Sequence, residues 1–181
     1  MSFYLGTNGI LRNHFFDYLS KEKFGHRLEK TLVSGDKPFN RSPAIIDDSE
    51  VIVSELMRKN PLTIEIDTPL ISVQKIFKEK GFRHLPVLKD SRIVIGMISD
   101  RDLLKVETMG TFQFLAANAI MKTILILVDE DTPVAQVAKV MVEEKISAMP
   151  VINKEHHMVG IITKTDLLKG LFEYRLRDTR I

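Results

Sequence analysis

Residues 96–105 read GMISDRDLLK, and residues 160–169 read GIITKTDLLK. The two stretches are 64 positions apart, and the same shift aligns residues 53–105 with residues 117–169 without a gap. Fifteen of these 53 paired positions are identical, and most of the others exchange similar residues. A register kept over that length predicts two homologous units in tandem.

Each repeat predicts the element order β-α-β-β-α. In the first copy the expected elements are a strand over 62–66, a helix over 69–80, strands over 85–88 and 93–98, and a helix over 101–106. Thr68 is expected to cap the first helix, with Pro69 at its first position and Gly81 ending it. The second copy repeats this order from residue 126 to about 174. The predicted fold class is therefore α/β, with the two units packed as an intramolecular pair, because a unit of about 50 residues has a small core.

The expected division of the chain is an N-terminal arm or helix at 1–50, unit 1 at 51–108, unit 2 at 109–174 and a C-terminal tail at 175–181. Within the arm, residues 13–23 are predicted to form an amphipathic helix around Phe15, Phe16 and Leu19. Residues 35–43 are predicted to be a loop because the stretch contains Pro38 and Pro43.

Composition excludes several classes of function. Lys and Arg number 26 against 24 Asp and Glu, so the net charge of +2 does not indicate a nucleic-acid-binding surface. The absence of cysteine excludes a thiolate nucleophile or a zinc–sulfur site, and favours a cytoplasmic location. The longest apolar run, residues 124–128, is far shorter than the roughly 18 residues of a membrane span. No catalytic or metal-binding motif is present, so we expect a protein that is not an enzyme.

Both copies carry the pattern G-x-x-[ST]-x-x-D where the last strand runs into the last helix. The residues concerned are Ser99, Arg101 and Asp102 in the first copy and Thr163, Lys164 and Asp166 in the second. A hydroxyl at a helix start leaves N–H groups that favour an anion, and a carboxylate three residues on can accept two hydrogen bonds from a diol. A ribonucleotide offers both groups. The same residues also make a good helix cap, so both interpretations stay open at this level.

Together with residues 82–87, FRHLPV, and residues 146–151, ISAMPV, these segments resemble a tandem pair of CBS domains (cystathionine-β-synthase domains). The resemblance covers about residues 51–172 and includes stand-alone bacterial pairs. It implies a regulatory module that binds an adenosine-type ligand, such as AMP, ADP, ATP, S-adenosylmethionine or a cyclic dinucleotide, in the cleft between the units. No other cofactor is implied. A regulated partner protein is expected, and its identity is unknown.

In the family the Asp holds the ribose, the Ser or Thr and basic residues meet phosphate, and the strand before Pro-Val frames the adenine. Carried over, site one consists of Thr63, Arg83, His84, Pro86, Ser99, Arg101 and Asp102, and site two of Leu127, Ser147, Ala148, Pro150, Thr163, Lys164, Thr165 and Asp166. Leu127 and Ala148 depart from the polar residues common at their positions. We therefore expect site one to prefer multiply phosphorylated nucleotides, and site two to take ligands with less phosphate or to stay empty.

A homodimer is also expected, because C₂ pairing is the commonest symmetry of soluble oligomers. The apolar helix faces around Val137, Val140 and Met141 and around Leu103 and Leu104 are its predicted interface. The alternative function is a structural dimerisation module with empty pockets.

Overall fold

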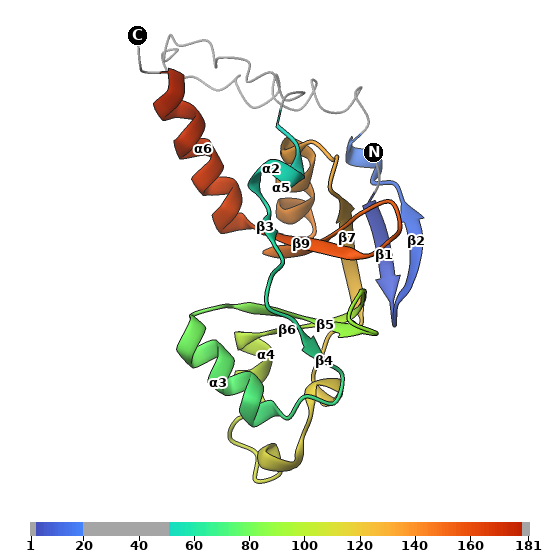
Figure 1. The fold of residues 1–181 in the computed structure, drawn as a ribbon, viewed down its shortest axis with the longest axis vertical. Helices are drawn as coiled ribbons and strands as arrows, with labels where there is room; N and C mark the ends of the chain where they lie inside the picture. Colours follow the sequence, from blue (N-terminus) through green and yellow to red (C-terminus); the bar gives the residue numbers. More distant parts are fainter. Residues whose placement is uncertain (1–2, 20–50, 179–181) are drawn as a thin grey trace, which may run out of the picture.

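The structure is a computed structural model that describes residues 3–19 and 51–178, and its two units lie one above the other (Figure 1). Unit 1 contains β4 (Ile64–Glu65), α3 (Leu70–Lys80), β5 (His84–Lys89), β6 (Ile93–Ser99) and α4 (Asp100–Leu104). Unit 2 contains β7 (Ile124–Asp129), α5 (Val134–Glu143), β8 (Ala148–Ile152), β9 (Met158–Thr163) and α6 (Lys164–Asp178). The predicted α/β fold with two β-α-β-β-α units is confirmed.

Helix α3 shows how local sequence sets the element boundaries. Its N-cap is Pro69, one residue later than predicted, and its C-cap Gly81 has a φ of 65°, where a residue without a Cβ is favoured. The Gly81 N–H donates to the Phe77 carbonyl. Leu70, Val73 and Phe77 form the buried face of this amphipathic helix.

The two units use the same strand pairing. In unit 1 the sheet order is β4-β5-β6, and in unit 2 the order β7-β8-β9 lies inside a sheet of six strands. The first strand of each unit runs parallel to the second, with Ile64 opposite Val87 and Val128 opposite Val151. These two pairs are 64 positions apart, so the sequence repeat is also a repeat of register. Strand β4 has only two residues, fewer than predicted.

The segment that precedes the first strand of each β-α-β-β-α unit packs into the other unit. Strand β3 (Arg58–Lys59) comes just before β4 in the chain, yet it pairs with β9 of unit 2. The equivalent contact in the other direction is a bridge between Met97 in β6 and Lys122, just before unit 2. The 3₁₀ turn η3 (Ala117–Ala119) likewise places buried Ala117 in the core of unit 1. The units are therefore interlocked, and neither is complete without a segment from the other repeat.

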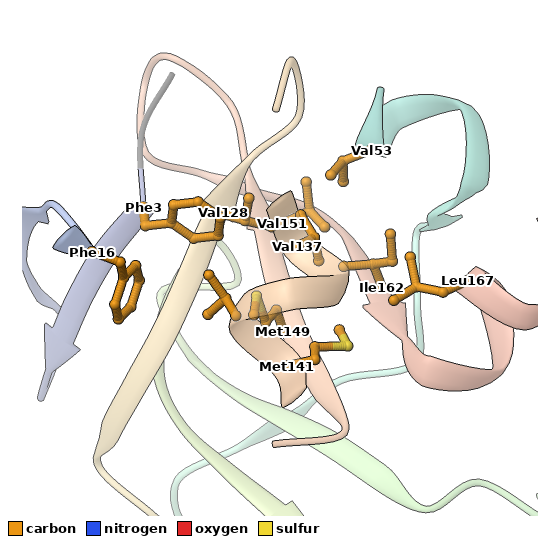
Figure 2. Close-up of a cluster of buried hydrophobic side chains, with 11 residues drawn as sticks. Phe3, Phe16, Val53, Val128, Val137, Met141, Met149, Val151, Ile162 and Leu167 are labelled. Atoms are coloured by element: carbon orange, nitrogen blue, oxygen red, sulfur yellow. The ribbon is translucent and has the colours of Figure 1, made fainter. Parts of the chain in front are cut away.

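The core of unit 2 gathers side chains from distant parts of the sequence (Figure 2). Helix α2 (Val53–Leu56) contributes Val53, which is fully buried, and its backbone N–H donates to the Thr132 carbonyl at 2.9 Å. At the other side of the cluster Phe3 and Phe16 come from the N-terminal segment, with ring centroids 5.4 Å apart. Residues outside the repeat thus help to complete this core.

The N-terminal segment is a β-hairpin, so the helix predicted over residues 13–23 is wrong over its described part. Strands β1 (Phe3–Thr7) and β2 (Ile10–His14) are joined by a two-residue turn in which Asn8 and Gly9 have φ of 52° and 83°. Asn-Gly is the preferred pair for such a turn. Only the short 3₁₀ helix η1 (Asp17–Leu19) follows, and residues 20–23 and the predicted loop at 35–43 lie outside the described residues.

The helix faces predicted to form a dimer interface are mostly buried inside the units. Val137, Val140 and Met141 are fully buried in the core of unit 2, because α5 turns its apolar face toward its own sheet. Leu103 is buried in unit 1 in the same way, whereas Leu104 is exposed. The prediction is therefore wrong for every residue named except Leu104.

Candidate ligand-binding site

Asp102 lies at the start of α4, where β6 ends, and its carboxylate is held by the residue that caps the helix. Ser99 donates both its backbone N–H and its hydroxyl to Oδ2 of Asp102, at 3.2 and 2.5 Å, and its hydroxyl accepts from the Asp102 N–H at 3.3 Å. The side chain of Asp102 is only 6% exposed. One carboxylate oxygen is thus committed to the cap, and the other, Oδ1, faces cations.

Asp166 has the same arrangement at the start of α6. The Thr163 N–H and hydroxyl donate to Oδ2 of Asp166 at 3.0 and 2.6 Å, and the Thr163 hydroxyl accepts from the Asp166 N–H. Asp166 is 7% exposed. The helix-cap interpretation therefore holds at both positions, and it leaves Oδ1 of each carboxylate available for a second interaction.

The cations that face these oxygens were missed by sequence reasoning. Oδ1 of Asp102 lies 3.2 Å from Lys105 Nζ and 3.7 Å from Lys122 Nζ, and Oδ1 of Asp166 lies 3.7 Å from Arg58 Nε. Lys122 and Arg58 each belong to the segment that crosses from the other repeat. The available signal was that residues 58 and 122 are both basic and stand 64 positions apart.

These contacts and the burial of each group shift two pKa values in unit 1. Burial raises the pKa of Asp102, but the hydrogen bonds from Ser99 and Lys105 and the charge of Lys122 outweigh it, so the net shift is downward. The pKa of His84 is lowered, chiefly by burial of its ring. Asp102 is therefore a stable anion at neutral pH, and His84 is biased toward its neutral form.

His84 and Ser147, which the resemblance assigned to different sites, lie within hydrogen-bond distance across the two units. His84 Nε2 is 3.1 Å from the Ser147 hydroxyl oxygen. His84 also pairs with Ser99 in the β5–β6 ladder, so it connects Ser99 and Asp102 to Ser147 in unit 2. The two sets of site residues thus meet where the units touch.

The residues expected to frame an adenine base differ between the units. Thr63, just before β4, is half-buried, and Pro86 beside it in β5 is buried. In unit 2 Leu127 is fully buried, Pro150 is buried, and Ala148 is only 8% exposed. The residues predicted to frame a base are therefore partly accessible in unit 1 and buried in unit 2.

The residues expected to meet phosphate lie on the surface. Arg83, Arg101, Lys164 and Thr165 are all exposed. The backbone holds their segments in equivalent positions, since the Asp100 N–H donates to the Arg83 carbonyl and the Lys164 N–H donates to the Ser147 carbonyl, both at 3.1 Å. Arg83 is thus held beside the start of α4, which contains Arg101, while Lys164 and Thr165 belong to the first turn of α6.

A shallow hollow of about 220 Å³ lies beside Asp166, between α2 and α6. Its lining includes Glu55 and Glu173, with Lys169 as a basic residue. Two additional carboxylates near Asp166 oppose the approach of phosphate. At the equivalent positions of the other repeat the chain has Ala119 and Met109, which carry no charge.

Comparison with known protein families matches the CBS domain twice in this chain, at residues 53–108 and 117–173. The chain belongs to the CBS domain family. A similar curated protein, a CBS domain-containing protein of Dictyostelium discoideum, is 29% identical over 136 residues, which are 68% of this chain and 93% of that protein. A homoserine O-acetyltransferase of Methanosalsum zhilinae is 26% identical over 127 residues, but the matched part is only 25% of that enzyme. In that enzyme the CBS pair is thus one part of a larger chain.

Solved structures show the same CBS-pair fold. The CBS domain pair of protein MJ0100, in complex with 5′-methylthioadenosine and S-adenosyl-L-methionine, is 27% identical, has a TM-score of 0.61, and covers 69% of this chain and 98% of that one. An acetoin utilization protein of Vibrio cholerae has a TM-score of 0.65 at 24% identity, with 72% of this chain and 98% of that chain covered. CBSX2 in complex with AMP has a TM-score of 0.62 at 20% identity, covering 68% and 98%. At the last two identities the likeness concerns the fold alone.

Neither a metal site nor a membrane span is found in the part of the chain that the structure describes. No group of three or more His, Cys, Asp or Glu side chains among those residues is placed to hold a metal ion. None of the described helices combines the length and the apolar character needed to cross a membrane.

Proposed function

We propose that this CBS pair is a regulatory ligand-sensing module that binds an adenosine-type nucleotide where its two units meet, and that it is not an enzyme. The observation that carries this proposal is the buried carboxylate of Asp102. One of its oxygens is bonded to the helix-capping hydroxyl of Ser99, and the other is turned toward Lys122 of the opposite repeat. A buried carboxylate with one committed oxygen is suited to accept the hydroxyls of a ribose.

The chemistry around Asp102 fits a nucleotide. Oδ1 of Asp102 is the acceptor for the ribose diol, while Lys122, Arg83 and Arg101 provide positive charge for phosphate. Thr63 and Pro86 form the wall against which the base stacks. Support from related proteins comes from the CBS pair of MJ0100, whose structure contains 5′-methylthioadenosine and S-adenosyl-L-methionine.

Sensing follows from the interlocked fold. Because Lys122 precedes unit 2 and Asp102 belongs to unit 1, a ligand at Asp102 contacts both repeats and alters how they pack. The hydrogen bond between His84 and Ser147 spans the same boundary. A ligand that binds one packing better than the other shifts the population between them, and a partner protein then reads this shift.

The decisive experiment is calorimetric titration with AMP, ADP, ATP, S-adenosylmethionine and a cyclic dinucleotide, followed by thermal shift. A ligand at 100 times its dissociation constant is expected to add about 2.7 kcal/mol to the free energy of unfolding. Asp102→Asn should lose this gain. Asp90→Asn, an exposed carboxylate in the β5–β6 turn, is the matched control and should keep it. No binding by any ligand of the panel would refute the proposal, and steady release of phosphate from ATP would refute its non-catalytic part.

We further propose a homodimer that uses the exposed residues of α4 and α6 rather than the buried faces. Leu104 and Leu168 occupy equivalent positions of the two repeats and are 63% and 57% exposed. Exposed leucines at matching positions, with Phe172 on α6 71% exposed, provide apolar area for a second copy. Light scattering on wild type should give twice the chain mass of 20.7 kDa, and the Leu104→Glu/Leu168→Glu variant should give the chain mass.

The structural alternative is a dimerisation module whose pockets stay empty. It is favoured by the fact that both carboxylates have cation partners within the chain itself. The two functions are separated by one comparison: a dimer whose stability does not respond to any ligand of the panel supports the structural module.

A further inference from the structure

The N-terminal hairpin lies along the edge of unit 2, outside the part of the chain that matches the CBS family. Strand β1 pairs antiparallel with β7, with Tyr4 opposite Leu127 and Gly6 opposite Leu125. The corresponding strand of unit 1, β4, pairs only with β5 among the described strands. The two halves of an otherwise repeated fold therefore differ at the strand that frames a base.

Side chains of the hairpin flank Leu127 on the face of β7 that looks toward unit 1. Alternate residues of a strand point to opposite faces. Val128 lies in the core under α5, while Leu127 lies in the apolar cluster between the units, together with Tyr4, Ala148 and Met97. We call this set, Tyr4, Leu88, Val94, Met97, Leu125, Leu127, Ala148, Ile152 and Ile161, the inter-unit cluster.

Contact between the hairpin and the base wall of unit 2 is close. A Cβ built on Gly6 would lie 2.7 Å from Cδ1 of Leu127, so a larger residue at position 6 would force the Leu127 side chain to shift. One built on Gly9, in the hairpin turn, would lie 3.1 Å from Cγ2 of Ile95 in unit 1. The hairpin thus spans from unit 2 to unit 1, and together with the other residues of the inter-unit cluster it buries Leu127 completely.

The apolar residues at site two match this covering. Leu127 stands where unit 1 has Thr63, and Ala148 stands where unit 1 has His84. Polar side chains at these two positions would be buried in the inter-unit cluster without a hydrogen-bond partner, at a cost in stability. Glu55 and Glu173, which lie beside Asp166, also disfavour a nucleotide at unit 2, because their carboxylates repel phosphate.

We infer that the N-terminal hairpin determines ligand stoichiometry: it closes the base-binding wall of unit 2, and the chain has a single adenosine site, built around Asp102. The number of ligands per chain rests on the proposed function, whereas the closure of the base-binding wall of unit 2 does not. Tyr4, Gly6 and Leu127 are the residues that exclude a ligand from unit 2.

The closure is tested without any nucleotide. The chain contains no cysteine, so a single introduced thiol reports on one position. Leu127→Cys should react with a thiol reagent at least about 100-fold more slowly than its repeat counterpart Thr63→Cys, because a fully buried thiol reacts only after local opening. Tyr4→Ala in the Leu127→Cys background should remove most of this difference. Equal rates in the two single-cysteine proteins would overturn the inference.

The stoichiometry is tested by calorimetry with ATP and, separately, AMP. Wild type should bind one equivalent per chain, Asp102→Asn should lose at least about tenfold in affinity, and Asp166→Asn should stay within about twofold of wild type. Two equivalents per chain, with one removed by each substitution, would overturn the single site. If no nucleotide binds, the proposed function and the stoichiometry fail together, while the thiol rates still decide whether the hairpin closes the wall.

Discussion

Gly160→Ala should destabilise the protein because the residue lies under the segment that crosses from the first repeat. A Cβ on Gly160 would lie 2.9 Å from the carbonyl oxygen of Arg58 and even closer to the sulfur of Met57. The Met57 side chain can move, but the Arg58 carbonyl belongs to β3, which pairs with Gly160 itself through Lys59. Relief of the clash therefore requires β3 to move away from β9, and Arg58 to move away from Asp166.

The magnitude follows from the geometry. Overpacking typically costs about 1–3 kcal/mol, and replacing glycine by alanine in a strand returns roughly 0.5–1 kcal/mol. We expect a net loss of about 1 kcal/mol for Gly160→Ala, which is about 2–4 °C in Tm for a chain of this size. Gly96→Ala, its repeat counterpart, should lose less, because the nearest backbone atom, the Lys122 carbonyl oxygen, is 3.2 Å away.

The assay is urea unfolding followed by circular dichroism, with Gly110→Ala as the control. A Cβ on Gly110 meets no atom within 4 Å, so this variant should stay within about 0.5 kcal/mol of wild type. If Gly160→Ala were as stable as Gly110→Ala, β3 would not be docked on β9, and the assignment of Arg58 to the Asp166 cluster would be refuted.

Three further predictions concern Asp102, His84 and the two helix-capping hydroxyls. The pKa of Asp102 is lower in the folded state than in the unfolded state, so its ionised form stabilises the fold. This contribution to the free energy of unfolding is complete above about pH 4 and is lost as pH falls through the folded pKa. Asp102→Asn should therefore weaken the fall in the free energy of unfolding at acid pH. The pKa of His84 is lowered, so stability should decline as pH falls from about 6.5 toward the folded pKa, and His84→Gln should remove this decline; an NMR pKa for His84 above its ordinary value would contradict it. Loss of the helix cap in Ser99→Ala should cost about 1 kcal/mol in urea unfolding, and Thr163→Ala a similar amount; no change in either would argue against the cap geometry.

Local features of this protein were readable from the sequence. The 64-residue repeat predicted the two units, and the three-residue spacing from Ser99 to Asp102 predicted a capped helix start, because a helix turn brings these two residues together wherever it lies. The Asn8-Gly9 pair was an equally local signal for the hairpin. It was missed because the phenylalanines that follow were interpreted as a helical face, whereas Phe16 packs on Phe3 across the hairpin.

The approach of Lys122 and Arg58 to the carboxylates could not be read in this way. It depends on β3 pairing with β9 and on Lys122 pairing with Met97 in β6, which are contacts between residues far apart in the chain. The same holds for the hydrogen bond between His84 and Ser147, which joins residues 63 positions apart. Repeat analysis identifies equivalent residues, but it does not say which copy's cation meets which copy's carboxylate.

The two units, their element order and the capped carboxylates could therefore be predicted, because they follow from hydrophobic periodicity and from spacings within one helical turn. Three features depend on the assembled fold: the exchange of the segments before β4 and β7 between the units, the burial of the apolar face of α5 inside unit 2, and the packing of the hairpin against Leu127. Those outcomes depend on which strand edge has unpaired backbone groups and on which packing removes the most apolar surface from water. Such choices are made by the assembled sheet and not by any local stretch of chain.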